Sequence, residues 1–153
     1  MTLYAETSAV VAWLLGDERA GRAGVAWSQL VAADVVHSSD LTLVECDRTL
    51  RRAVATGRIS ASESLRLHAI VDRASAFWTL HGMDAEVVER SRRSFPCEPI
   101  RSLDALHLAT ALVVRNLSPE VQVLSFDERI RDNATALGLD VVPAMVSQPP
   151  RSG

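Results

Sequence analysis

The stretch VQVLSFDERI, residues 121–130, decides the fold. Val121 to Leu124 form a short apolar run with the length and composition of a buried strand. Ser125 and Glu128 follow at the spacing of a capping box, in which the two side chains satisfy free backbone amides at a helix start. The stretch therefore predicts a strand that leads directly into a helix, and Gly138 marks the end of that helix.

The same alternation of apolar runs and helical segments extends over the rest of the chain. The further strand candidates are residues 3–5, 35–37, 77–80 and 139–142. Helices are predicted at residues 9–15, 20–31, 61–76, 84–92 and 103–115, and from Ser39-Asp40 to a stop at Gly57, with further start signals at Thr7-Ser8, Ser60-Ala61-Ser62-Glu63 and Ser102. Strands that alternate with helices are typical of a parallel sheet covered by helices. We therefore predict an α/β fold.

The segment from Leu103 to Arg115 is predicted to be a central, buried helix, because apolar residues cover it nearly all round. These residues are Leu103, Ala105, Leu106, Leu108, Ala109, Leu112 and Val113. Residues 95–99, which precede it, carry two prolines and are expected to form a loop.

Length and composition limit the classes of protein to consider. The 153 residues fit one domain, predicted over residues 1–146, with a disordered tail at 147–153. Sixteen basic and nineteen acidic residues give a net charge of −3, which argues against nucleic-acid binding by bulk charge alone. Two cysteines without a CxxC pair suggest neither a disulfide framework nor a zinc site. No signal peptide or membrane-spanning stretch is recognisable, so we expect a soluble, cytoplasmic protein.

Four acids lie where strands end or helices begin. Glu6 follows the first strand, and Asp127 lies just past the strand that ends at Leu124. Asp104 lies in the first turn of the buried helix, and Glu45 in the first turns of the helix after the second strand. In an open parallel sheet, strand ends and helix starts share one edge, where ligands bind. The four carboxylates are therefore predicted to meet in one pocket.

Each acid also has an ordinary structural interpretation. Glu6, Asp104 and Asp127 are near helix starts, where the helix dipole favours a negative charge. Glu45 has Arg48 and Thr49 one turn along its helix, as on a solvated helix face. The functional interpretation therefore depends on the set of four and not on any single residue.

Four sequence motifs resemble the successive acidic motifs of PIN domains. They are Tyr4-Ala5-Glu6-Thr7-Ser8-Ala9-Val10, Leu43-Val44-Glu45, Leu103-Asp104-Ala105-Leu106-His107-Leu108-Ala109 and Val123-Leu124-Ser125-Phe126-Asp127-Glu128-Arg129. The resemblance covers residues 3 to about 142 in the expected order, and it is greatest to the VapC-like toxins of bacterial toxin-antitoxin modules. It implies a PIN-like three-layer sandwich, with a central parallel sheet of four or five strands flanked by helices.

The resemblance also implies a ribonuclease site. Glu6, Glu45, Asp104 and Asp127 would be both the metal ligands and the catalytic residues, with the Ser8 hydroxyl supporting the first acid or the substrate phosphate. Close carboxylates need a cation to offset their repulsion, and oxygen ligands favour Mg²⁺ or Mn²⁺ over zinc. The implied partners are an RNA substrate, a VapB-like antitoxin and a second copy of the chain in a homodimer. Most PIN domains carry aspartate at the first position, so Glu6 departs from the family pattern.

Basic residues near the acids have two interpretations each. Arg101, Arg129 and Arg131 flank the third and fourth acids, and they are candidates for RNA phosphate contacts or ordinary surface arginines. His107, three residues after Asp104, is either a metal ligand on the same helix face or, by default, a hydrogen-bonded core residue.

Two functions from different classes remain. The first is a metal-dependent endoribonuclease that an antitoxin restrains. The second is a PIN-like binding module whose catalysis Glu6 has impaired, so that it acts through partner or RNA binding. A phosphoacceptor receiver domain is set aside, because it needs a late lysine and the sequence contains none.

Overall fold

The computed structural model describes residues 1–16 and 21–144. Its centre is a five-stranded sheet in which every strand pairing is parallel. The strand order is β3-β2-β1-β4-β5, with the strands at Thr2–Ala5 (β1), Val35–Ser39 (β2), Thr79–His81 (β3), Gln122–Leu124 (β4) and Asp140–Val142 (β5). This arrangement confirms the predicted α/β fold with its central parallel sheet.

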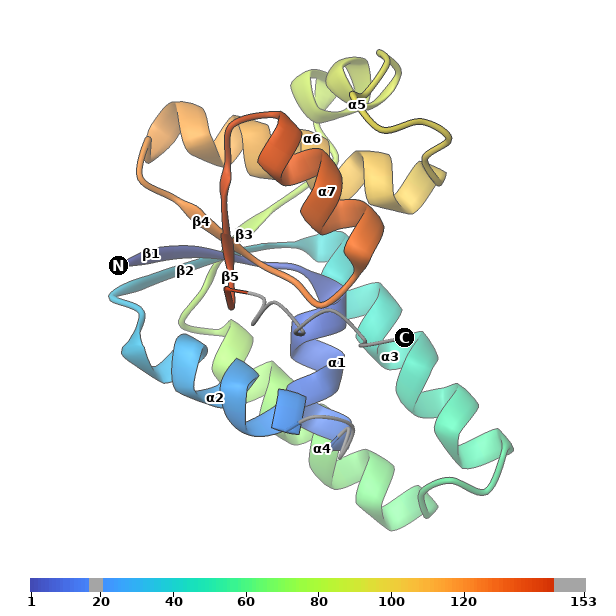
Figure 1. Ribbon diagram of the computed structural model, residues 1–153. Coiled ribbons are helices and arrows are strands. Elements are labelled where there is room, and N and C mark those ends of the chain that lie inside the picture. Colours follow the sequence, from blue (N-terminus) through green and yellow to red (C-terminus); the bar gives the residue numbers. More distant parts are fainter. Residues whose placement is uncertain (17–20, 145–153) are drawn as a thin grey trace, which may run out of the picture.

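Helices cover both faces of the sheet and make three layers (Figure 1). One face carries α1 (Thr7–Leu15), α2 (Arg22–Ala32), α3 (Asp40–Ala55) and α4 (Ala61–Ser75). The other face carries α5 (Ala85–Ser91), α6 (Ser102–Leu117) and α7 (Glu128–Ala136). Helix α6 is the predicted central helix, and half of its residues are buried.

Strand β1 lies at the centre of the sheet, and its side chains alternate between the two layers of helices. Leu3, Tyr4 and Ala5 are all fully buried. Tyr4 belongs to the core beneath α6 and α7, with Leu108, Val123 and Ile130. Ala5 belongs to the opposite core, with Val10, Cys46 and Val71. A continuous apolar run thus fits a strand that is covered on both faces.

Helices α1 and α7 begin at acids instead of at the predicted hydroxyl residues. Glu6, and not Thr7 or Ser8, is the N-cap of α1. Asp127 is the N-cap of α7 in place of Ser125. The prediction was wrong because the hydroxyl groups make hydrogen bonds to other parts of the chain, which local spacing does not reveal.

The remaining boundaries follow the sequence pattern with small shifts. Ser39 and Ser60 cap α3 and α4 as predicted. Ser102 is the first residue of α6 and not its cap, because Arg101 occupies the cap position without a side-chain cap bond. The third strand begins two residues later than predicted, because Phe77 lies in a turn and is 90% exposed.

Some sequence predictions fall on residues that the structure does not describe. The expected helix start at Ala20 and the expected tail at 147–153 both lie outside the described residues. The extent of the single domain, residues 1–146, stays a prediction. Within residues 1–16 and 21–144, none of the helices has the length and apolar character needed to cross a membrane.

Candidate active site

The four candidate acids lie where strands end and helices start. Glu6 directly follows β1 and caps α1, and Asp127 follows β4 and caps α7. Asp104 lies in the first turn of α6, and Glu45 in the second turn of α3. Because β1, β2 and β4 run parallel, the segments that follow them share the carboxyl edge of the sheet.

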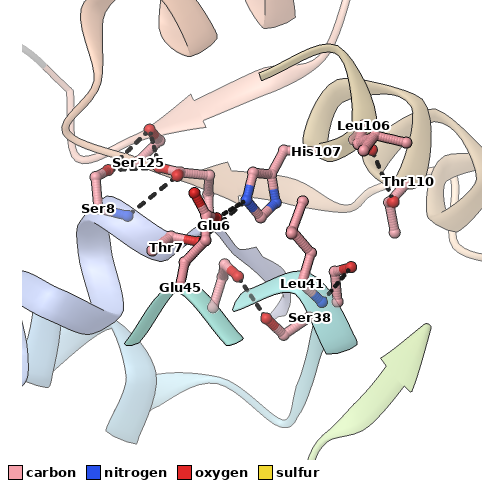
Figure 2. Close-up of polar contacts among 12 residues, drawn as sticks. Glu6, Thr7, Ser8, Ser38, Leu41, Glu45, Leu106, His107, Thr110 and Ser125 are labelled. Atoms are coloured by element: carbon pink, nitrogen blue, oxygen red, sulfur yellow. Dashed lines mark hydrogen bonds and ion pairs between the residues drawn. The ribbon is translucent and has the colours of Figure 1, made fainter. Parts of the chain in front are cut away.

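Hydrogen bonds from the protein hold the Glu6 carboxylate in place. Glu6 is 5% exposed; its Oε1 accepts the Ser8 amide at 3.1 Å. Its Oε2 accepts the hydroxyl of Ser8 and, at 2.7 Å, that of Ser125 (Figure 2). Burial raises the pKa of Glu6, and the nearby His107 and the three hydrogen bonds oppose that rise.

Ser8 and Ser125 tie together the two loops that follow β1 and β4. The Ser8 hydroxyl oxygen accepts the Phe126 amide at 2.8 Å, and the Ser125 hydroxyl oxygen accepts the Asp127 amide at 3.1 Å. Their two hydroxyl oxygens lie 3.2 Å apart. Glu6 and Asp127 are therefore joined through a single side chain, Ser125.

Glu45 is held from two sides through one oxygen. Its Oε2 accepts the Thr7 hydroxyl at 2.6 Å and lies 2.7 Å from His107 Nε2 (Figure 2). Burial opposes ionisation of Glu45, but the hydrogen bonds from His107 and Thr7 outweigh it and hold the pKa below its ordinary value. Thr7 is the chain neighbour of Glu6, so this contact links the acid of α3 to the acid at the end of β1.

Asp104 is the acid that the protein leaves unsatisfied. Its Oδ2 is buried and has no hydrogen-bond partner in the part of the chain that the structure describes. Burial and repulsion from Asp127 raise the pKa of Asp104, against the attraction of Arg101, His107 and Arg129. Asp127 uses its Oδ1 to cap α7, through the amides of Arg129 and Ile130. The two aspartates therefore lie close enough to repel each other.

These donors suit a hard divalent cation. All four acids offer oxygen, which Mg²⁺ and Mn²⁺ prefer, and the unpaired Asp104 Oδ2 is a free ligand atom. Among the described residues, no group of three or more His, Cys, Asp and Glu side chains is placed to hold a metal ion. A Mg²⁺ ion needs only one or two carboxylates, because water and substrate oxygens complete its coordination. Asp104 and Asp127, whose charges repel each other, are two such carboxylates.

A cleft of about 300 Å³ opens beside Ser8 and Asp127. Arg22 and Arg58 line it, together with Phe126 and apolar residues of α1. The Arg22 guanidinium lies 5.5 Å from the centre of the Phe126 ring. Positive side chains thus lie next to the acidic site, as binding of an anionic chain requires.

Comparison with known proteins identifies the family. A model of the PIN domain matches residues 3–136, most of the chain. The chain belongs to the PIN-domain family. Ribonuclease VapC35, in two strains of Mycobacterium tuberculosis, is 35% identical over 105 residues, which cover 69% of this chain and 70% of the relative.

Solved structures show the same PIN-domain fold. VapC20 of Mycobacterium tuberculosis, described as a sarcin-ricin loop cleaving toxin, superimposes with a TM-score of 0.60 at 22% identity, covering 90% of this chain and 95% of that chain. VapBC2 of Rickettsia felis, solved with a DNA fragment from its own promoter, gives a TM-score of 0.58 at 8% identity. The superposition covers 92% of this chain and 97% of that chain. At these identities, the likeness establishes the fold alone.

The three arginines predicted to contact RNA differ in exposure in this PIN domain. Arg101 and Arg129 are exposed, and their charges act on Asp104. Arg131 does not fit the predicted RNA contact, because it is only 8% exposed. Its guanidinium donates to the backbone carbonyls of Ser125, Val142 and Pro143, and so fastens α7 to the ends of β4 and β5.

Three polar residues of the PIN-domain site were missed in the sequence, namely Tyr4, Thr7 and Ser125. All three lie inside the motifs that the sequence had singled out, within two residues of Glu6 or Asp127. Ser125 donates to Glu6, Thr7 donates to Glu45, and the Tyr4 hydroxyl lies against His107, so each contact joins residues far apart in the sequence and no local pattern signals it. His107 is 2% exposed and hydrogen-bonded, which agrees with its default interpretation as a core residue.

Proposed function

We propose that this PIN-domain protein is a metal-dependent endoribonuclease and the toxin of a VapBC-type module. The observation that carries the proposal is the buried, unpartnered Asp104 Oδ2 next to Asp127. A buried carboxylate oxygen without a partner costs free energy, so it is expected where a ligand completes it. The similarity to ribonuclease VapC35 supports the same reaction class.

In this proposal, Asp104 and Asp127 hold the Mg²⁺ or Mn²⁺ ion, with Glu45 and Glu6 completing the acidic site. When bound, the ion supplies a water of lowered pKa and stabilises charge on the phosphoryl oxygens. Glu45 stays ionised because its pKa is lowered. Arg101 and Arg129, exposed residues whose charges act on Asp104, bind phosphates of the RNA.

The roles of Glu6 and Ser8 follow from their hydrogen bonds. Glu6 already accepts three bonds from the protein, so its main task is to hold the loops after β1 and β4 in position. Ser8 supports Glu6 through its amide and its hydroxyl. A glutamate at this position therefore keeps the charge while it caps α1.

We further propose a cytoplasmic protein that forms a homodimer and binds a small VapB-like antitoxin. Support for the antitoxin comes from the fold shared with VapBC2 of Rickettsia felis. Co-purification with the product of a neighbouring reading frame tests the antitoxin. Light scattering of the purified protein tests the dimer.

A nuclease assay on RNA tests the reaction itself. The wild type should cleave RNA with Mn²⁺ or Mg²⁺, and EDTA should abolish cleavage. Asp104→Asn should lower kcat by about 100-fold or more, because it removes a ligand charge. Asp72→Asn, an exposed acid on α4, is the matched control and should cleave like the wild type. Cleavage that persists in EDTA and in Asp104→Asn would contradict the metal mechanism.

Glu6→Asp separates this proposal from the impaired binding module. The ribonuclease proposal expects the wild type to be active, and expects the shorter side chain to weaken the bonds to Ser8 and Ser125. An inert wild type that gains activity with Glu6→Asp would favour the binding module. The similarity to a ribonuclease does not favour that alternative.

A further inference from the structure

A buried histidine of α6 contacts the acid of α3. His107 lies one turn after Asp104 on α6 and is 2% exposed. Its Nε2 lies 2.7 Å from Glu45 Oε2 and 3.0 Å from Thr7 Oγ1, and its Nδ1 lies 3.0 Å from the Tyr4 hydroxyl oxygen. Side chains from β1, α1, α3 and α6 therefore meet in one hydrogen-bonded chain (Figure 2 shows its Glu45, Thr7 and His107 members).

The groups involved determine the direction of each hydrogen bond. A carboxylate oxygen accepts hydrogen bonds, so His107 Nε2, 2.7 Å from Glu45 Oε2, carries a hydrogen and donates it. In the neutral imidazole, Nδ1 then carries no hydrogen and accepts. Burial raises the pKa of Tyr4, so the phenol keeps its hydrogen and donates it to Nδ1. The chain runs from Tyr4 through His107 to Glu45.

This chain leaves Glu45 little freedom. Two donors, His107 and Thr7, share its Oε2, so the carboxylate cannot turn without breaking both short bonds. Hydrogen bonds to a charged group are shorter and stronger than those between neutral groups. No hydrogen bond reaches Oε1 from residues 1–16 and 21–144, so this oxygen remains for another ligand.

We propose that His107 is a positioning residue, which holds the Glu45 carboxylate at a fixed orientation and separation from Asp104 and leaves one glutamate oxygen for a divalent cation. The inference rests on the proposed function, because the cation is the one proposed there. It goes beyond the default role of a hydrogen-bonded core residue. A residue that only fills space needs the volume of the ring, whereas positioning needs a donor at Nε2.

Two amide variants separate these roles. His107→Gln places an amide N–H near the position of Nε2, and His107→Asn places one near Nδ1, too short to reach Glu45. Binding of Mn²⁺ alone is measured by calorimetry. Loss of a hydrogen-bond partner behind a metal ligand typically costs 10–100-fold in metal affinity, so we expect about that loss in His107→Asn. His107→Gln should retain most of the affinity, and kcat on RNA should fall in the same order with little change in KM.

His68→Asn is the matched control. His68 on α4 also faces a carboxylate, with Nε2 3.2 Å from Asp47 Oδ1, but it lies outside the site. Its substitution should leave Mn²⁺ affinity and kcat unchanged. Thr7→Val, of nearly the same shape, removes the second donor to Glu45 Oε2 and should also weaken Mn²⁺ binding. It carries the test if a His107 variant does not fold, which circular dichroism detects.

The outcomes are distinguishable. If the wild type binds Mn²⁺ and His107→Asn, His107→Gln and Thr7→Val all bind it with the wild-type affinity, the positioning role alone is overturned. Equal losses in His107→Asn and His107→Gln, with Thr7→Val unchanged, would also overturn it, because ring volume would then be the requirement. A wild type that neither binds Mn²⁺ nor cleaves RNA would overturn the proposed function and this inference with it.

Discussion

The two halves of the acidic site differ in how far the protein satisfies their oxygens. In the half built on β1 and β4, Glu6 accepts three hydrogen bonds and the loops around it are tied by two serines. In the half built on α6, Asp104 Oδ2 is buried without a partner among the described residues, and Asp127 repels it. The first half stabilises the fold, and the second has free energy to gain from a cation. The proposed cation therefore binds where the hydrogen bonding of the carboxylates is incomplete.

The largest expected effect is a loss of stability when a hydrogen bond is removed from the half around Glu6, called here the satisfied half. Ser8→Ala removes one donor from buried Glu6 and the acceptor of the Phe126 amide. Leaving buried groups unpaired costs about 1–3 kcal/mol, and more near a charge, so we expect a loss of about 3 kcal/mol in the free energy of unfolding. Urea denaturation measures it.

Ser28→Ala is the control for that substitution. The Ser28 hydroxyl also makes a hydrogen bond, to the Val25 carbonyl, but on the exposed side of α2. Its loss should change the free energy of unfolding by no more than about 0.5 kcal/mol. Equal effects of the two substitutions would remove the distinction between a satisfied half and the rest of the surface.

The next effect is stabilisation by a cation at the half around Asp104, called here the unsatisfied half. A cation that binds only the folded state raises stability by RT ln(1 + [L]/Kd), which is about 1.4 kcal/mol at ten times Kd. Mn²⁺ should therefore raise the melting temperature of the wild type by several degrees. Asp104→Asn should lose this increase, whereas Ser8→Ala, less stable from the start, should keep most of it. An equal increase in Asp104→Asn would place the cation elsewhere.

The fold was largely predictable from the sequence because its signals are local. Apolar runs, caps and glycine stops gave the order of strands and helices, and the caps Ser39 and Ser60 were confirmed. Ser125 shows where local reasoning ends. It has the spacing of a cap, but its hydroxyl bonds to Glu6, 119 residues away in the sequence, and Asp127 caps the helix instead.

The sequence predicted where the four acids lie in the fold, but not the hydrogen bonds that they make. The motifs placed Glu6, Glu45, Asp104 and Asp127 near strand ends and helix starts, because a parallel sheet brings these positions to one edge. The bonds from His107 to Tyr4 and Glu45 join residues 103 and 62 positions apart. Arg131 is buried only because β5 and the residue after it supply carbonyls, and no local pattern shows that.

The smallest effect concerns pH and the unsatisfied half. The pKa of Asp104 is raised in the folded state, so its ionised form destabilises the fold. This destabilisation is absent well below the unfolded pKa of about 4 and complete at neutral pH. At pH 7 without metal, the free energy of unfolding of Asp104→Asn should therefore exceed that of the wild type by about 0.5 kcal/mol after solvent screening. Urea denaturation measures this difference. The advantage should disappear as the pH falls towards 4.

Glu45→Gln should behave in the opposite way, because the pKa of Glu45 is lowered and its charge stabilises the fold above about pH 4.5. If both variants lose stability at pH 7, Asp104 belongs with the satisfied acids, and the contrast between the two halves fails.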